Sequence, residues 1–415
     1  MSRTFLHVDG DAFFASCEVA KNPGLRGQPV VTGAERGIVS AATYEAKALG
    51  ITRGMPIAQV RRQFPSVTII SSDYETYATY GKRMYDIVRR YAPKVEEYGI
   101  DECFGEFPEP VEACVAKARE MKAVLKQELD ITFSVGLGPT KVLAKLGSKR
   151  NKPDGFTVVD APHLQAYLMS TPVRYVWGIG PSTAARLAGE GVESALNFTQ
   201  KPESWVEERF SWPVVLLWHE LCGTPVMELE TAAKESYHSI QKTRTFGPPV
   251  TDPERLRSEL AKNIESACAK ARRYGLKAHG FSFFLKTQSF AYFSDEGRLP
   301  HPTNVPEDVI RAVLARFPDV FRSRTRYRAT GITLTGLARN HDLTSDLFGG
   351  SPVTKKLEAV YACVDALALK YGTGVVHLAA STRALAACAA SSPDYESFAP
   401  ATGKRLNIPL LGEVT

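Results

Sequence analysis

The sequence predicts a mixed α+β fold that is divided into several domains, and three observations lead to this prediction. Its 415 residues exceed the usual size of one domain, so two to four domains are expected. In the N-terminal part, strand-like and helix-like segments follow the order strand, helix, paired strands, helix, strand. In residues 239–334 the order is βαββαβ, which is typical of a ferredoxin-like unit.

The composition excludes several classes of protein. Hydrophobic residues make up 44% of the chain and charged residues 23%, which is ordinary for a globular protein. No stretch approaches the roughly 18 consecutive apolar residues of a membrane span. The first residues lack the apolar core of a signal peptide, and seven scattered cysteines favour reduced thiols, so a cytoplasmic, bacterial protein without a membrane partner is expected. The net charge of +6 permits a polyanionic partner.

The first elements are expected to be a strand over residues 5–8, which ends at Asp9, and a helix over residues 13–20. Residues 28–72 contain short apolar runs broken by glycine and proline, which predicts a small mixed subdomain. Apolar side chains recur at helical spacing over residues 76–91, so a helix is expected before Pro93. The N-terminal part therefore combines a strand that ends in a carboxylate with helices able to cover it.

An acidic turn is expected between two strand segments in residues 95–104, and it contains Asp101 and Glu102. A helix near 111–128 and a strand near 131–137 complete the α+β core. If these strands neighbour one another, Asp9 converges with the acidic pair. Carboxylate oxygens suit magnesium, and two ions about 3.5–4 Å apart activate a hydroxyl and neutralise a triphosphate during in-line displacement. Taken alone, each acidic motif is more often an ordinary turn or a solvated edge.

The second half of the chain changes character twice. From residue 172 to 235 the pattern is helical with short breaks, which predicts a small helical domain. The βαββαβ unit follows, with strands expected at 239–246, 280–287, 290–293 and 327–334 and helices at 253–274 and 306–317. Beyond residue 340 the chain is rich in alanine, serine and glycine, and one helix is expected near 352–370.

Four sequence blocks resemble the signature blocks of one enzyme family in order and spacing. They are His-Val-Asp-Gly-Asp-Ala-Phe-Phe-Ala-Ser-Cys-Glu at 7–18, Tyr-Glu-Ala-Lys-Ala-Leu-Gly at 44–50, Tyr-Gly-Ile-Asp-Glu-Cys-Phe at 98–104, and the run from Gly136 through Lys145 to Gly155. In these blocks the chain resembles the Y-family DNA polymerases. Within that family it is most similar to the UmuC branch, which comprises the catalytic subunits of bacterial DNA polymerase V.

The resemblance implies a right-hand polymerase with a palm, small fingers, a helical thumb and a ferredoxin-like little finger. The implied boundaries are 1–17 and 73–165 for the palm, 18–72 for the fingers, 166–235 for the thumb with a helix-hairpin-helix module, and 236–340 for the little finger. Residues 341–415 would form a C-terminal tail that binds a partner or a clamp. The implied activity is low-fidelity, template-directed DNA synthesis past damaged bases, as in DNA repair and an SOS-type response.

The resemblance also implies the catalytic residues. Asp9, Asp101 and Glu102 would ligate two Mg²⁺ ions, and Gly10 would lend its carbonyl oxygen. Asp11 is not implied, because that position is not uniformly acidic in the family. Gly99 stands where the family usually has serine, which is expected to alter the turn more than the chemistry.

A second set of residues is implied to bind the deoxynucleoside triphosphate. Phe13 and Phe14 belong to this set, and Phe14 falls on the steric gate that excludes a ribose 2′-hydroxyl. Without the resemblance, Phe14 would be an ordinary core aromatic. Tyr44 and Lys47 share one helix face and are implied to contact the triphosphate together with Lys152. Lys47 replaces the commoner arginine, and a lysine binds phosphate as a point charge rather than as a bidentate fork.

Primer-template DNA is the expected macromolecular partner. Gly178 and Gly180 resemble the hairpin of a helix-hairpin-helix module, whose amides suit a DNA phosphate. Period-two spacing places Lys242 with Arg244 on one sheet face and predicts the same for a second run at the start of another strand. The second run consists of Arg322, Arg324, Arg326 and Arg328. Such basic strands could lie along a duplex backbone, although a charge run is more often a solvated face.

Two further partners are expected, one from a segment of the tail and one from the family resemblance. Asp346, Leu347 and Phe348 end a segment that resembles a sliding-clamp-binding peptide without its initial glutamine. The UmuC-like pattern makes a UmuD-like accessory subunit a second possible partner. Three alternatives stay open at this point: a non-catalytic accessory paralogue, a recombination scaffold, and another two-metal enzyme such as a nucleotide cyclase.

Overall fold

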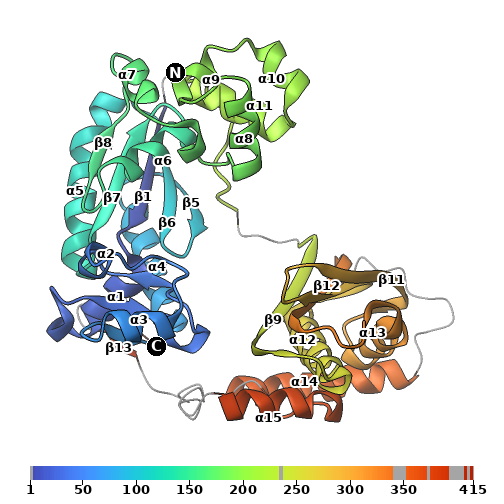
Figure 1. Ribbon diagram of the computed structural model, residues 1–415. Coiled ribbons are helices and arrows are strands. Elements are labelled where there is room, and N and C mark those ends of the chain that lie inside the picture. The colour runs from blue at the N-terminus through green and yellow to red at the C-terminus, as the bar shows by residue number, and fades with distance from the viewer. Residues whose placement is uncertain are drawn as a thin grey trace. The chain divides into compact units, whose positions relative to one another are not determined.

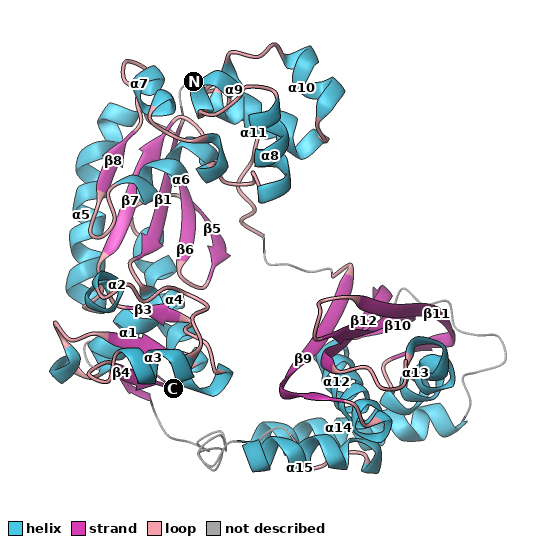
Figure 2. Cartoon of the chain, viewed as in Figure 1, coloured by secondary structure: helices cyan, strands magenta, loops and turns pink. Residues whose placement is uncertain are grey.

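The computed structural model describes residues 3–232, 237–339, 352–371, 374–391, 406–408 and 412–414. The chain divides into two compact units, Met1–Ala233 with Arg405–Thr415, and Lys234–Lys404. Figure 1 labels the elements of both units, and Figure 2 separates helices from strands. None of the described helices is long and apolar enough to cross a membrane.

A five-stranded sheet with strand order β5-β6-β1-β7-β8 is the centre of the first unit. Its strands are β1 (Thr4–Gly10), β5 (Lys94–Gly99), β6 (Glu102–Phe107), β7 (Phe133–Gly138) and β8 (Phe156–Val158). Its helices are α1 (Phe13–Lys21), α4 (Tyr74–Arg89), α5 (Val111–Leu129) and α6 (Lys141–Arg150). Leu6 and Val8 pack with α1, α4 and α5 in one core. Because side chains alternate along a strand, His7 and Asp9 belong to the opposite face, against which α6 packs.

A smaller mixed subdomain follows α1. It contains a three-stranded sheet of order β3-β2-β4. The elements are β2 (Val30–Thr32), β3 (Ala41–Ala42), β4 (Thr68–Ile70), α2 (Tyr44–Ala48), α3 (Ile57–Gln63) and the 3₁₀ turns η1 (Pro23–Leu25) and η2 (Ala34–Arg36). The Thr43 hydroxyl caps α2 by accepting the Ala46 N–H. This cap fixes the start of the helix that carries Tyr44 and Lys47.

A helical subdomain completes the first unit. Its elements are α7 (Leu164–Met169), η3 (Val173–Tyr175), α8 (Pro181–Gly189), α9 (Ala195–Thr199), α10 (Glu203–Arg209) and α11 (Trp212–Leu221). Glu220 is fully buried on α11, and its carboxylate accepts the N–H groups of Val142, Val226 and Met227. A buried carboxylate with three backbone donors is well satisfied, so it ties α11 to the start of α6.

The second unit has the expected order βαββαβ. Its elements are β9 (Ser239–Val250), α12 (Pro253–Arg273), β10 (Leu276–Thr287), β11 (Tyr292–Thr303), α13 (Pro306–Val320) and β12 (Tyr327–Arg339), with sheet order β11-β10-β12-β9. Both helices pack on one face of the sheet. The strand expected over residues 290–293 is wrong in its extent, because β11 runs to Thr303 and Phe290 lies in the preceding turn.

The expected helix near 352–370 is confirmed as α14 (Pro352–Tyr371). It is followed by η4 (Ala379–Ser381) and α15 (Thr382–Ser391), which the sequence pattern did not predict. Arg272 of α12 forms a bidentate ion pair with Asp365, with N–O distances of 2.7 and 2.8 Å. α14 is therefore docked on the helical side of the second unit. Two short strands, β13 (Leu406–Ile408) and β14 (Gly412–Val414), pair near the C-terminus.

Candidate active site

The register of the central sheet brings the three predicted carboxylates together. In the antiparallel pair β1 and β6, Asp9 lies opposite Glu102. The Gly10 N–H donates a 2.8 Å hydrogen bond to the Asp101 carbonyl oxygen, which joins the end of β1 to the acidic turn. The convergence expected for these strands is therefore confirmed, and it results from strand pairing rather than from sequence proximity.

Gly10 is needed for close packing at the strand end. A Cβ atom at this position would lie 2.5 Å from Cδ2 of Phe13. Phe13 is only 3% exposed, and its ring packs near that of Phe133. The Phe13 ring thus belongs to the core below the strand end, although the residue also lines the adjacent pocket.

Asp101 and Glu102 have different electrostatic environments. Burial, together with the charges of Asp9 and Glu102, raises the pKa of Asp101. Burial also opposes ionisation of Glu102, but polar contacts with His7 and Lys145 outweigh it and lower its pKa to about 2. The Lys145 ammonium group donates to both Glu102 oxygens, at 3.0 and 2.9 Å. Complete burial lowers the pKa of His7, whose Nδ1 contacts the Ser148 hydroxyl at 2.7 Å.

The donor set fits a hard divalent cation. Ligand atoms of His7, Asp9 and Glu102 lie within 4.8 Å of one another. Burial, which is the larger cause, and the charges of Asp9 and Glu102 both raise the pKa of Asp101, and a bound cation would offset them. His7 already contacts Ser148 and Glu102, so the carboxylate oxygens are the donors best placed to bind an oxygen-preferring ion.

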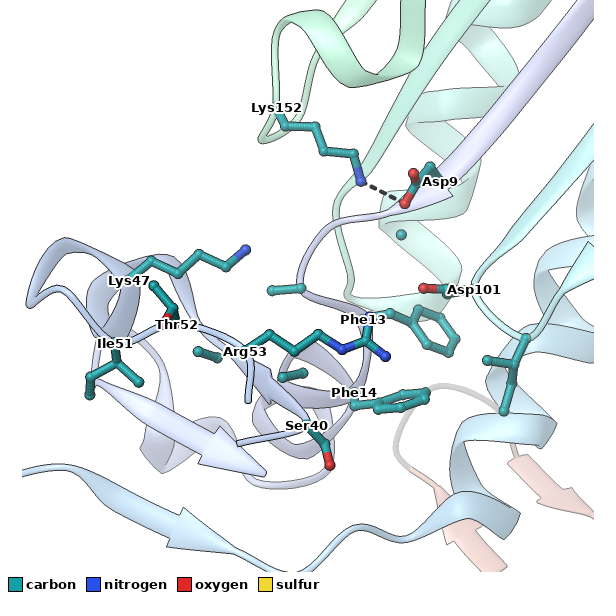
Figure 3. Close-up of a pocket in the computed structure, with 15 residues that line it drawn as sticks. Asp9, Phe13, Phe14, Ser40, Lys47, Ile51, Thr52, Arg53, Asp101 and Lys152 are labelled. Atoms are coloured by element: carbon teal, nitrogen blue, oxygen red, sulfur yellow. Dashed lines mark hydrogen bonds and ion pairs between the residues drawn. The ribbon is translucent and has the colours of Figure 1, made fainter. Parts of the chain in front are cut away.

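A pocket of about 680 Å³ adjoins the carboxylates. Figure 3 shows Asp9 and Asp101 on one side of it and Lys47 on the other. Lys152 also lines the pocket, and its ammonium group lies 2.5 Å from an Asp9 oxygen. Burial and the positive charge of Lys152 lower the pKa of Lys47, because both ammonium groups face the same pocket. The pocket therefore presents both carboxylates and ammonium groups to one ligand, with Lys152 paired to Asp9.

Phe14 is one of the residues that line this pocket, whereas Tyr44 is not. Lys47 Nζ lies 4.0 Å from the centroid of the Tyr44 ring, which confirms that both share one face of α2. Burial, with the charges of Asp11 and Asp9, raises the pKa of Tyr44 to about 12. Phe14 lines the pocket, and its ring stacks on that of Tyr77 at 4.6 Å. Stacking fixes the Phe14 ring as part of the pocket wall.

The chain is similar in sequence to known proteins over most of its length. Residues 8–149 match the impB/mucB/samB family, and residues 237–347 match the C-terminal domain of that family. DNA polymerase IV of Moorella thermoacetica is 30% identical over 91% of this chain and 96% of its own length. The protein UmuC of Salmonella typhimurium is also 30% identical, over 90% of this chain and 93% of its own length.

The chain belongs to the Y-family of DNA polymerases. The solved structure of a Y-family polymerase chimera, Dbh-Dpo4(243-245)-Dbh, shares the fold with a TM-score of 0.67. It is 24% identical and covers 81% of this chain and 100% of its own length. The palm, fingers, thumb and little finger expected for the family are thus present as the sheet domain, the mixed subdomain, the helical subdomain and the βαββαβ unit.

Several pocket residues of this polymerase were not predicted. Arg53 and Ser40 line the pocket, and Figure 3 shows the Arg53 side chain extending toward Phe13 and Phe14. No residue-type pattern marks Arg53 in isolation, because only the fold of the fingers brings it over the palm. Lys145 lies in a predicted block, but its role beside Glu102 was not predicted. The sequence indicates only that Lys145 follows Lys141 by four residues on a helix, so that both lie on one helix face.

Asp11 has a different position from the other carboxylates. It is 1% exposed, and its oxygens accept the Ser134 hydroxyl at 2.8 Å and the Asp154 N–H at 2.7 Å. The Asp154 N–H belongs to the Lys-Pro-Asp-Gly turn that carries Lys152. Asp11 therefore holds the Lys152 turn, which agrees with its omission from the expected metal ligands.

The predicted DNA-binding glycines lie at the start of α8 in the polymerase thumb. Gly178 has φ +86°, and a Cβ atom there would lie 2.7 Å from a Leu217 methyl group. Gly180 is the N-cap residue of α8, and a Cβ atom there would meet nothing within 4 Å. Gly178 is thus required by packing, whereas Gly180 leaves the start of α8 open to a ligand.

The predicted arrangement of basic side chains in the little finger is confirmed for the first pair and wrong for the second run. Lys242 and Arg244 do share a face, but they pair with Ile332 and Thr330, and the Ile332 side chain lies in the core under α12. Both side chains therefore belong to the helix-covered face rather than to the open face. The open face of β9 presents Gln241, Thr243 and Thr245 instead, as period-two alternation from the buried Ile240 requires.

The second run of arginines does not alternate along a strand. β12 begins only at Tyr327, so Arg324 and Arg326 lie in the preceding loop, and Arg324 has φ +61°. The loop is held by two hydrogen bonds, one from the Arg322 N–H to the Tyr327 side-chain hydroxyl and one from the Gln288 N–H to the Arg326 carbonyl oxygen. Arg328 alone of the three predicted residues is in the strand. The predicted clamp-binding residues Asp346, Leu347 and Phe348 lie outside the described residues.

Proposed function

We propose that this Y-family polymerase joins a deoxynucleotide to a primer 3′-hydroxyl at the pocket between Asp9, Asp101 and Lys47. One observation carries the proposal: a single pocket is lined by the carboxylates of Asp9 and Asp101, by two ammonium groups and by a stacked aromatic ring. Acidic and basic groups placed in this way complement a metal-bound triphosphate, with the anion facing the lysines and the cations facing the carboxylates.

Asp9, Asp101 and Glu102, with the Gly10 carbonyl oxygen, would hold two Mg²⁺ ions. When bound, the ions supply charge neutralisation and activation of the attacking hydroxyl. The chain itself provides positioning. Lys145 holds both oxygens of Glu102 in one orientation, and the pairing of β1 with β6 fixes the separation of Asp9 from the acidic turn. Catalysis then depends mainly on preorganised charge.

Lys47 and Lys152 would bind the triphosphate, and Tyr44 would donate its hydroxyl to it. The pKa of Tyr44 is raised to about 12, so the hydroxyl keeps its proton at neutral pH and is able to donate. Lys152 is paired with Asp9 in the absence of substrate, at 2.5 Å. Binding of the metal-bound nucleotide would replace this pair, because the carboxylate gains a divalent cation and the ammonium gains a phosphate.

Phe14 would act as the steric gate. Its ring is held by Tyr77 at 4.6 Å with an interplanar angle of 13°, so it cannot move aside without losing the stack. An additional hydroxyl on the sugar would meet a ring of fixed position. Phe13 would contribute only the pocket floor, since its ring is buried.

Translesion synthesis past damaged template bases is the expected use of this activity. The thumb glycine Gly180 and the arginines Arg324, Arg326 and Arg328 would contact the DNA backbone, with Gly178 shaping the thumb turn. Lys242 and Arg244, on the helix-covered face at edge strand β9, would do so only from the edge of the sheet. Asp346–Phe348 would bind a sliding clamp, and a UmuD-like subunit would be the second partner.

Primer extension tests the catalytic proposal. Purified protein, a primed template, Mg²⁺ and deoxynucleotides should give extension, and Asp101→Asn should lower its rate by about 1,000-fold. Asp86→Asn is a matched control, because Asp86 is exposed and pairs only with Arg89 in the described structure. Equal extension by Asp101→Asn and wild type would contradict the proposed ligand set. The alternative of a non-catalytic accessory paralogue predicts no extension at all, and the presence of all three carboxylates argues against it.

A further inference from the structure

The turn between β10 and β11 carries two strongly exposed aromatic side chains. Phe290 is 59% exposed and Tyr292 is 57% exposed. Phe290 also has φ +69°, a left-handed conformation that is uncommon for a bulky residue and that glycine adopts without cost. Neither burial nor backbone geometry therefore explains a phenylalanine at this position, which points to a role outside the fold.

Cations lie over both rings. Lys286 Nζ is 4.9 Å from the centroid of Phe290 and 4.5 Å from that of Tyr292, and it donates a 2.7 Å hydrogen bond to the Tyr292 hydroxyl. Arg328 Cζ is 4.2 Å from the centroid of Phe290. Among the described residues, neither Lys286 nor Arg328 has a carboxylate within ion-pair distance. Their charges are thus available to an anionic ligand.

The aromatic surface continues onto the open face of the sheet. The Tyr292 ring lies 5.2 Å from that of Phe284, which is half-buried. Phe284 pairs with Gly331, and a Cβ atom at Gly331 would lie 2.5 Å from the Phe284 ring. Gly331 therefore makes room for the ring to lie along the sheet. Phe284, Phe290 and Tyr292, with Lys286 and Arg328, form a surface that we call the aromatic tip.

We propose that the aromatic tip binds single-stranded DNA, with unpaired bases stacking on the rings and phosphates contacting Lys286 and Arg328. Rings interleaved with unpaired cations are suited to a strand that exposes both bases and phosphates. A duplex keeps its bases stacked internally, so it would use the cations but not the rings. The proposal rests on the proposed function for the identity of the strand, which is the unpaired template.

Binding measurements on the full-length protein test this proposal. Fluorescence anisotropy would follow a labelled oligothymidylate and, separately, a labelled duplex, over a range of salt concentrations. The double variant Phe290→Ala/Tyr292→Ala should bind the single strand about tenfold more weakly, or worse, with an unchanged salt slope. Lys286→Ala and Arg328→Ala should each reduce the slope of log K against log salt by about 0.7, because each removes one phosphate contact.

Two controls separate binding from folding. Tyr274→Ala removes another exposed aromatic ring, which packs near Tyr237 at the opposite end of β10, and it should leave the affinity for the single strand unchanged. Phe290→Gly suits the left-handed backbone, so it should keep or raise the unfolding temperature while weakening binding. Retained affinity in Phe290→Gly would overturn the stacking role of that ring.

Other outcomes of these measurements distinguish the proposed single-strand binding from other roles of the aromatic tip. An equal loss of affinity for the duplex and the single strand would overturn the stacking role and assign the tip to DNA of either form. Unchanged affinity in the double variant would overturn the proposal and leave the tip as a surface for a protein partner. Asp101→Asn should bind the single strand as wild type does. If wild type failed to extend a primer while the tip variants still lost single-strand binding, only the proposed catalytic function would fail.

Discussion

Asp101 and Glu102 are adjacent in the sequence, yet their surroundings act on their pKa values in opposite directions. Burial and two neighbouring carboxylates raise the pKa of Asp101. Lys145 and His7 overcome burial at Glu102 and lower its pKa to about 2. Glu102 therefore contributes stability that is present above the ordinary pKa of glutamate, about 4.3, and is lost as the pH falls toward 2. Ionised Asp101 destabilises the fold unless a cation binds.

Asp101→Asn should therefore raise stability while it removes activity. A carboxyl group whose pKa is raised by folding opposes the native state at every pH above its folded pKa, and the effect disappears below its ordinary pKa of about 3.9. The unfolding temperature of Asp101→Asn without metal at pH 7 should exceed that of wild type by about 1–3 °C. Scanning calorimetry measures the difference.

Magnesium provides the control for this prediction. Added Mg²⁺ should raise the unfolding temperature of wild type, because a ligand that binds only the native state stabilises it, and should do so much less in Asp101→Asn. A variant that is less stable than wild type at pH 7, or equally stabilised by Mg²⁺, would show that Asp101 is not a crowded metal ligand.

Phe14→Ala should admit ribonucleotides. Removing the ring opens space beside the sugar, so the preference for deoxynucleotides in kcat/KM should fall by about 10–100-fold. Phe14→Tyr is the matched variant, since it keeps the ring that stacks on Tyr77 and should keep the preference. Steady-state incorporation of both sugars opposite one template base measures it. Unchanged discrimination in Phe14→Ala would place the gate elsewhere.

Lys47 should make nucleotide use sensitive to alkaline pH. Burial and the charge of Lys152 lower its pKa, so its positive charge is present at low pH and is lost earlier than for an ordinary lysine as the pH rises. The value of kcat/KM for the nucleotide should then fall on the alkaline side. Lys47→Arg should remove this fall, because arginine stays charged, whereas Lys47→Ala should raise KM at all pH values. A pH profile identical in Lys47→Arg and wild type would contradict the assignment.

At the scale of elements, the close contact between β7 and α6 positions the lysines of the site. A Cβ atom on Gly136 would lie 2.0 Å from the Ala144 carbonyl oxygen and 2.4 Å from the Ser148 N–H nitrogen. Backbone atoms cannot move aside as a side chain can, so no larger residue fits without displacing the helix. The same helix carries Lys145, which holds Glu102.

Gly136→Ala should therefore reduce stability and activity together. Displacement of α6 should lower the free energy of unfolding by about 3 kcal/mol, a value typical of overpacking, and should loosen the Lys145–Glu102 contact. Gly189→Ala is a suitable control, because a Cβ atom there would meet nothing within 4 Å. Denaturant unfolding and primer extension measure both effects. Wild-type stability in Gly136→Ala would show that α6 is able to shift freely.

Periodic patterns predicted the main helices and strands, because each buries one face against the core. The convergence of the carboxylates was predictable because Asp9 is at a strand end and Asp101 is in a turn between strands, whereas their role as metal ligands was predicted only from the family resemblance. Loops and edges were less predictable. The arginines before Tyr327 have the spacing of a strand, but a hydrogen bond from Arg322 to the Tyr327 hydroxyl closes a loop there. Contacts such as Lys145 with Glu102 join distant segments, so local sequence does not indicate them.

At the scale of the whole molecule, the C-terminal helices belong to the unit that contains the βαββαβ sheet. Besides the ion pair with Asp365, Arg272 lies with its Cζ 4.6 Å from the Tyr361 ring, and the Tyr361 hydroxyl donates a 2.7 Å hydrogen bond to Glu307. Ser258 on α12 accepts the Ala384 N–H at 3.0 Å. These contacts attach α14 and α15 to the two helices of the little finger.

Asp365→Asn should lower the stability of this unit without changing nucleotide binding. The Arg272 side chain is only 12% exposed, so loss of its carboxylate partner leaves a mostly buried charge. We expect a decrease of about 1–2 kcal/mol, which calorimetry would record as a lower transition temperature. The nucleotide pocket lies entirely in the other unit, so KM for the deoxynucleotide should stay at the wild-type value. A changed KM would show that the docked helices act on the catalytic unit, and an unchanged transition would show that the ion pair is not needed to hold α14.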